Sequence, residues 1–171
     1  FIANYEGVGI NAMREALKKL GFFDAEETAV GATIVKTEYE HMIDSDTRDI
    51  IISSCCHTVV TLIQKYFPAV IPCIAPVISP MMASAKLIKE EYPDAYVVFI
   101  GPCISKKDEM QKVPGYIDCV LTFDELVQWF QMRHIEVAPA PVAESEGRAS
   151  RFFPRTGGII ECMHTRGTGY K

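Results

Sequence analysis

The sequence lacks the cysteine spacing of a zinc finger or a dithiol redox centre, because no two cysteines form a Cys-x-x-Cys pair. The six cysteines stand at positions 55, 56, 73, 103, 119 and 162. A chain of 171 residues can bury a full hydrophobic core, so it does not depend on disulfides for stability. We therefore expect a reducing, cytoplasmic setting in which the thiols are free or bind a metal.

Long apolar runs and basic clusters are also missing. Prolines and charged residues interrupt every apolar run before it reaches the roughly 20 residues of a membrane-spanning helix. The net charge is −5, and no basic run is longer than a pair such as Lys106-Lys107, which argues against a nucleic-acid partner. The composition, 49% hydrophobic and 23% charged, is that of an ordinary globular domain. We expect a single domain over residues 1–171, and the start at Phe1 without a methionine indicates a fragment.

Apolar runs alternate with helical patterns along the chain. Strands are expected at 32–35, 50–52, 96–100 and 117–121. Helices are expected at about 10–20, 37–43, 59–66, 81–91 and 122–132, with a possible short one after Gly157-Gly158. The last long helix opens with the capping box Thr122-x-x-Glu125. This alternation predicts an α/β domain with a mostly parallel sheet flanked by helices.

Two segments are expected to be loops. Residues 70–80 are rich in proline, which favours a loop or an extended crossing. Residues 136–151 are rich in alanine, proline, glutamate and serine, so we expect an exposed, mobile loop there.

Three cysteines stand where an expected strand gives way to a loop. Cys55 and Cys56 follow the run at 50–52, and Cys103 follows the run at 96–100. Ligands of parallel sheets gather at the carboxyl ends of strands, so these thiols are candidates for a site. Adjacent side chains at a strand end point in different directions, so the paired cysteines suit two separate tasks. The other three cysteines lie in apolar surroundings and are expected to be core residues.

A charged segment follows Cys103. Lys106, three residues further on, could donate hydrogen bonds to an anionic ligand. The pattern alone fits a solvated, charged turn slightly better.

The motifs together resemble those of the iron-only (di-iron) hydrogenases. "SSCC" at 53–56, "SP" at 79–80 and "GPCISKKDE" at 101–109 resemble the first two cluster-binding motifs of that family. Three further segments resemble the family in the same order: "MREALKKLGF" at 13–22, "IDCVLTFDEL" at 117–126 and "TGGIIE" at 156–161. The resemblance covers essentially the whole chain. It implies a hydrogenase catalytic domain, whose reaction is the reversible reduction of protons to hydrogen.

The resemblance also implies roles for individual residues. Cys56 and Cys103 correspond to two of the four thiolate ligands of a 4Fe–4S cluster, which the family joins to a di-iron centre. Cys55 corresponds to the thiol that passes protons to and from that centre, and Lys106 to the residue that binds an iron-bound cyanide. The other matched positions are Ser54 and Pro102, expected to line the cofactor, and Glu109, Ser79 and Glu40, expected on a proton path. Ferredoxin or fused iron–sulfur domains are the implied electron partners.

The sequence departs from the family pattern in three places. The third motif, which carries the other two cluster ligands, is absent, so we expect this polypeptide alone to be inactive and without the cofactor. Gly101 replaces a methionine, Ser53 replaces a threonine and His57 replaces a proline. These changes resemble the sensory branch of the family, so a hydrogen- or redox-sensing module is the alternative function. A thiol oxidoreductase that uses Cys55 and Cys56 is a third possibility, disfavoured by the missing Cys-x-x-Cys pair.

Overall fold

The computed structural model describes residues 8–45, 49–138, 153–155 and 157–163. The chain divides into two compact units. The first consists of Phe1–Glu27 and Tyr96–Gly147, and the second of Thr28–Ala95 and Arg148–Lys171. The single domain expected over residues 1–171 stays a prediction. The loop expected at 136–151 lies largely outside the described residues.

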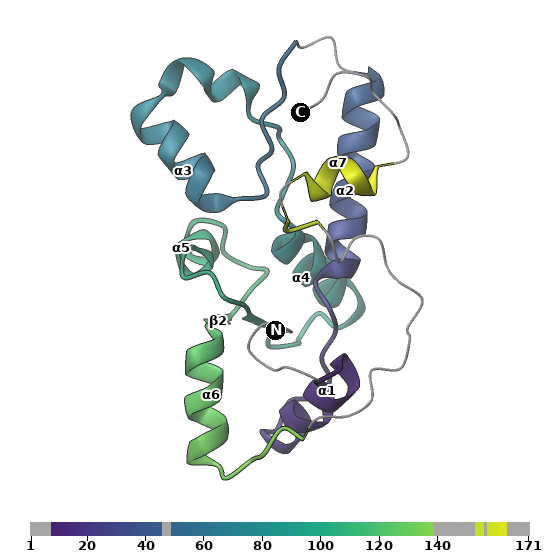
Figure 1. The fold of residues 1–171 in the computed structure, drawn as a ribbon, viewed down its shortest axis with the longest axis vertical. Helices are drawn as coiled ribbons and strands as arrows, with labels where there is room; N and C mark the ends of the chain where they lie inside the picture. The colour runs from purple at the N-terminus through teal and green to yellow at the C-terminus, as the bar shows by residue number, and fades with distance from the viewer. Residues whose placement is uncertain (1–7, 46–48, 139–152, 156, 164–171) are drawn as a thin grey trace. The chain divides into compact units, whose positions relative to one another are not determined.

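The first unit contains a two-stranded parallel sheet of β1 (Val98–Ile100) and β2 (Cys119–Leu121). Helix α5 (Ser105–Lys112) connects the two strands along the chain (Figure 1). Helices α1 (Ile10–Lys19) and α6 (Phe123–Met132) pack their apolar faces together in one core. That core consists of Val8, Met13, Ala16, Leu17, Leu126 and Phe130. The parallel strands and their helices confirm the predicted α/β class.

Local signals fix the boundaries of these helices. The Thr122 hydroxyl accepts from the Glu125 N–H at 3.3 Å, and the Glu125 carboxylate accepts from the Thr122 N–H at 2.7 Å. The capping box is therefore confirmed. Helix α1 ends just before Gly21, whose φ of 101° is the left-handed conformation that glycine adopts without strain.

The second unit is built on helices α2 (Ala29–Ser45) and α4 (Pro80–Glu91). They approach closely at Gly31, where the Cβ of any other residue would lie only 2.8 Å from the Ser84 nitrogen. Helix α7 (Gly158–Cys162) lies beside α2 in Figure 1, and its Ile159 packs against the same core. The core consists of Ala32, Val35, Tyr39, Ala75, Ala83 and Phe153.

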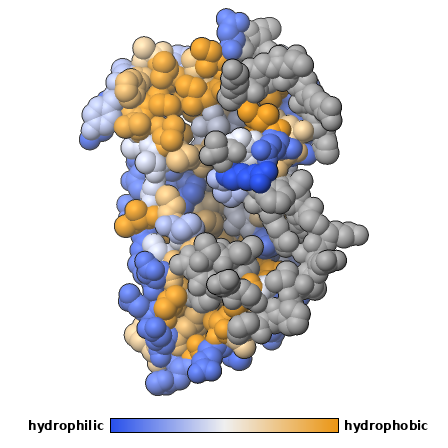
Figure 2. All heavy atoms as spheres, viewed as in Figure 1, coloured by the Kyte–Doolittle hydropathy of each residue, from blue (hydrophilic) through white to orange (hydrophobic). Residues whose placement is uncertain are grey.

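The rest of this unit is α3 (His57–Tyr66) followed by the 3₁₀-helix η1 (Pro68–Cys73). Exposed apolar side chains gather over these two elements on the face shown in Figure 2. They are Val59, Leu62, Tyr66, Phe67, Val70 and Ile71.

Three expectations are corrected. The strand expected at 32–35 is wrong, because these residues belong to α2, whose buried positions 32, 35 and 39 follow the helical repeat. The strand expected at 50–52 is reduced to one parallel bridge between Ile52 and Ile74. The first residues of the loop expected at 70–80 belong to the 3₁₀-helix η1 instead. A short helical turn accommodates proline, because the fixed φ of proline is close to the helical value.

Candidate functional site

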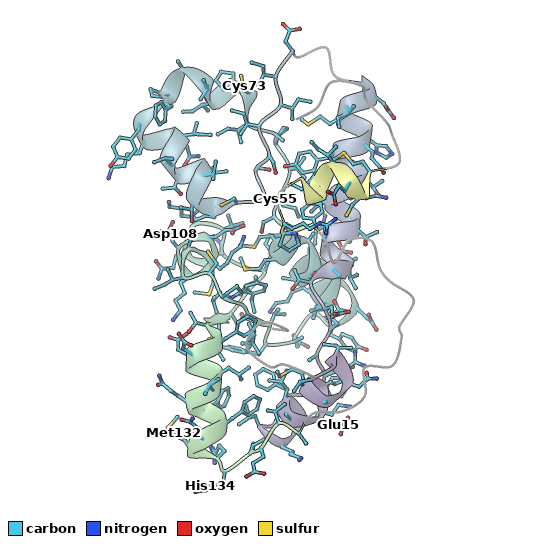
Figure 3. The ribbon with its side chains drawn as sticks, in the orientation of Figure 1. Glu15, Cys55, Cys73, Asp108, Met132 and His134 are labelled. Atoms are coloured by element: carbon cyan, nitrogen blue, oxygen red, sulfur yellow. The ribbon has the colours of Figure 1, made fainter. Side chains whose placement is uncertain are left out.

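The two adjacent cysteines have different environments. Cys55 is half-buried and packs against the core of the second unit, on the segment that leads into α3 (Figure 3). Cys56 is exposed and is the N-cap of α3, with an extended backbone and its carbonyl bonded to the Val60 N–H at 3.0 Å. The Cys55 side chain is therefore partly covered by the core, whereas the Cys56 side chain is exposed to solvent.

Tyr39 organises the segment before Cys56. Its hydroxyl oxygen lies 3.1 Å from the Ser53 Oγ and 3.1 Å from the Ser54 Oγ, and it accepts from the Ser54 N–H at 2.8 Å. The Cys55 Sγ lies 3.7 Å from the same oxygen. Burial raises the pKa of Tyr39 above its usual value, and the negative charge of Cys55 in its deprotonated form raises it further, while hydrogen bonds to the two serines partly offset this.

Sequence reasoning missed Tyr39. The available signal was its position, four residues after Val35 on the buried face of α2. A tyrosine in a core needs a partner for its hydroxyl group. The sequence does not say which residues provide that partner, because Ser53 and Ser54 lie in a different element.

Ser79 and Glu40 belong to the same unit as Cys55. Ser79 is buried and caps α4, where its hydroxyl accepts from the Met82 N–H at 3.4 Å. Glu40 lies on α2 and pairs with Lys36 across one helical turn at 3.5 Å, with both side chains largely buried. Their assignment to a proton path stays a prediction.

The first unit holds the segment from Pro102 to Glu109. Pro102 and Cys103 are exposed in the turn after β1, and the Cys103 carbonyl accepts from the Lys106 N–H at 3.1 Å as α5 begins. Lys106 Nζ lies 2.6 Å from Glu109 Oε2, and the two side chains are only 14% and 9% exposed. The structure thus brings Lys106 and Glu109 together as a largely buried ion pair.

Gly101, which stands before this turn, has a neighbour that explains it. A Cβ at this position would lie 2.7 Å from Cε1 of the Phe99 ring. The aromatic ring therefore occupies the space that a larger residue at position 101 would need.

The candidate residues divide between the two units. Ser54, Cys55, Cys56, Ser79 and Glu40 belong to the second unit, and Pro102, Cys103, Lys106 and Glu109 to the first. Within the described ranges, no three His, Cys, Asp or Glu side chains form a group that could hold a metal ion. None of the helices described is long and apolar enough to cross a membrane.

Sequence comparison identifies relatives over nearly the whole chain. The family model of the iron only hydrogenase large subunit, C-terminal domain, matches residues 3–169. The NADP-reducing hydrogenase subunit HndD of Solidesulfovibrio fructosivorans is 29% identical over 87% of this chain and 31% of its own length. Iron hydrogenase 1 of Clostridium pasteurianum is 26% identical over 85% of this chain and 30% of its own length. The chain thus spans about a third of these relatives.

Solved structures of an algal hydrogenase have the same fold. The apo form of a variant of the [FeFe]-hydrogenase HydA1 from Chlamydomonas reinhardtii aligns with a TM-score of 0.71 at 25% identity, over 91% of this chain and 46% of that one. Another HydA1 variant, with alanine in place of a glutamate, gives the same TM-score and identity and is covered to 45%. By its family match, the chain belongs to the iron-only hydrogenase large subunit, C-terminal domain family.

Proposed function

We propose that this chain contributes two cluster ligands and a proton-transfer thiol to a hydrogenase that reversibly reduces protons to hydrogen. The observation that carries the proposal is the contrast between Cys55 and Cys56. One thiol is half-buried and hydrogen-bonded to the Tyr39 hydroxyl group, which suits a proton carrier, and the other is exposed, which leaves its sulfur accessible to a cluster. Family membership supports the same reading.

The donor chemistry fits the cofactor of the family. Cys56 and Cys103 are exposed thiols next to helix starts, and cysteine thiolates are the usual ligands of a 4Fe–4S cluster. When bound, the cluster and di-iron centre would supply electron transfer and the chemistry of hydrogen at iron, which no side chain provides. Ser54 and Pro102 would line the cofactor.

The chain's own residues would bind anions and move protons. Cys55 holds a proton at Sγ, facing the Tyr39 oxygen. The Lys106 ammonium group carries three donors, so it can bind an anionic group while it keeps its bond to Glu109. Glu109, Ser79 and Glu40 would carry protons between Cys55 and solvent. Ferredoxin or fused iron–sulfur domains in the cytoplasm would supply the electrons.

Residues 1–171 contain cysteines at two of the family's four ligand positions. A four-thiolate cluster needs two more, so we expect these residues alone to hold no stoichiometric 4Fe–4S cluster and to be inactive. Iron analysis and ultraviolet–visible spectra after anaerobic reconstitution test this expectation. A stable cluster on residues 1–171 alone would refute it.

Hydrogen evolution tests the activity itself. The protein that contains this chain within a complete hydrogenase domain is loaded with the cofactor and supplied with a reduced electron carrier under anaerobic conditions. We expect hydrogen production that Cys55→Ala abolishes. Cys73→Ala is the matched control, because Cys73 is also half-buried but lies in η1, and it should retain activity. A loaded protein that evolves no hydrogen contradicts the proposal.

A further inference from the structure

We propose that Tyr39 is a positioning residue whose hydroxyl group fixes the Ser53–Cys55 segment and thereby the place of the Cys55 thiol. The inference rests on the proposed function only for what the thiol does. The arrangement itself is read from the contacts of one buried side chain.

The Tyr39 hydroxyl group contacts each of the three residues from Ser53 to Cys55. It contacts the Oγ atoms of Ser53 and Ser54, accepts from the Ser54 backbone N–H, and lies near the Cys55 Sγ. The side chain itself is only 3% exposed and comes from α2, a separate element. One hydroxyl group on a packed helix thus contacts three consecutive residues of a loop. Loops are more mobile than helices, so these contacts restrict the loop more than contacts within the loop would.

The donors and acceptors in the hydrogen bonds of Tyr39 follow from the protons that each group has. The Ser54 Oγ donates its proton to the Val77 carbonyl at 2.5 Å, so towards Tyr39 it acts as an acceptor. The Tyr39 O–H therefore donates to Ser54. Its oxygen then has two acceptor positions, and the Ser54 N–H occupies one of them.

The second acceptor position is left for Ser53 or Cys55. The Ser53 Oγ also accepts from the Cys55 N–H at 3.4 Å, which ties the backbone of Cys55 to the same network. The thiol of Cys55 and the hydroxyl of Ser53 therefore compete for one lone pair of Tyr39. Through this shared oxygen, the position of the thiol depends on the hydroxyl of Tyr39.

Packing alone does not account for a tyrosine here. The Tyr39 ring belongs to the core of the second unit, and the ring of phenylalanine would fill the same space. Phenylalanine would, however, leave the Ser54 N–H without its acceptor. The hydroxyl is thus the part of the side chain that acts on the loop.

The test compares Tyr39→Phe with Tyr66→Phe in the full chain without cofactor. Tyr66 is an exposed tyrosine of the same unit, so its variant controls for the loss of a hydroxyl. Hydrogen exchange of the Ser54 amide should be about 3- to 10-fold faster in Tyr39→Phe, because one hydrogen bond is lost. Exchange of the Ala83 amide, which donates to the Ser79 carbonyl at the start of α4, should stay unchanged.

Alkylation of Cys55 is the second readout, followed at one fixed pH by mass spectrometry that resolves each cysteine. Its rate should change at least 3-fold in Tyr39→Phe, while the rate at Cys73 stays constant. Ser54→Ala is the second variant, because it removes a partner of Tyr39 without altering the core, and the Cys55 rate should change in it too. Wild-type Ser54 exchange and Cys55 alkylation in Tyr39→Phe, or wild-type alkylation in Ser54→Ala should the first variant not fold, would overturn the inference.

These readouts are independent of hydrogen turnover. A chain that evolves no hydrogen can still show the role of Tyr39. An active hydrogenase whose Tyr39→Phe variant behaves as wild type would contradict this inference alone.

Discussion

Lys106 donates from Nζ to Oε2 of Glu109 across one turn of α5, with 2.6 Å between the two atoms. Both side chains are largely buried, and the helix that carries them begins two residues after Cys103. The cation proposed to bind an anionic cofactor group is thus held by a carboxylate of the same helix. Its position is fixed before any cofactor binds.

Replacing one member of this pair should be costly. Lys106→Met leaves the buried Glu109 carboxylate without its partner, so we expect the free energy of unfolding to fall by about 3–5 kcal/mol. Urea unfolding measures this, and adding Glu109→Gln to the variant should restore most of the stability.

Lys112 provides the control, because it pairs with Asp108 on the same helix while both side chains are half-exposed. Lys112→Met should cost less than about 1 kcal/mol. Equal losses in Lys106→Met and Lys112→Met would show that the buried Lys106–Glu109 pair contributes no more to stability than the exposed pair.

Glu125 should stabilise the folded protein at neutral pH, and this contribution should be lost in acid. The Lys107 ammonium, followed by the N–H and hydroxyl of Thr122, lowers the pKa of Glu125 from 4.5 to about 2. A carboxyl whose pKa is lower in the folded state adds stability above its unfolded pKa and loses it as the pH falls. Thermal unfolding should therefore show Glu125→Gln less stable than wild type above pH 4.5. The difference should shrink towards pH 2.

The pH dependence of the difference in stability between Glu125→Gln and the wild type tests this prediction. Lys107→Met removes the largest cause of the lowered Glu125 pKa. The stability of this variant should therefore fall less than that of the wild type as the pH is lowered from 4.5 to about 2. A gap that is constant with pH would mean that the Glu125 carboxyl has an ordinary pKa in the folded protein.

Gly101 and Phe99 should behave as a coupled pair. Gly101→Met places a Cβ against the Phe99 ring, so we expect a loss of about 1–3 kcal/mol in the free energy of unfolding. Phe99→Ala in the same chain should remove the clash and recover part of the loss. Denaturant unfolding of the two single variants and the double variant tests this in a double-mutant cycle. Strictly additive effects would contradict the coupling.

Short-range patterns predicted the fold best. The runs that became β1 and β2, and the capping box of α6, each depend on residues within a few positions of one another. The run at 32–35 misled because a short apolar window fits a strand and a helix alike. The structure resolves it through the packing of Ala32 and Val35 with Ala83, which is far away in sequence.

The site shows the same limit. The expected change from strand to loop made Cys55, Cys56 and Cys103 candidates for a site, whereas the individual roles proposed for them came from the family resemblance. The part played by Tyr39 could not be predicted, because its partners lie 14 to 16 residues away and contact it only after folding.

The division of labour between Cys55 and Cys56 is the central claim, and iron content tests it most directly. Cys55→Ala, Cys56→Ala and the control Cys73→Ala are compared in a complete hydrogenase domain that contains this chain, after anaerobic cluster reconstitution. We expect Cys55→Ala and Cys73→Ala to bind as much iron as wild type, while Cys56→Ala loses cluster iron. Equal loss of iron from Cys55→Ala and Cys56→Ala would contradict it.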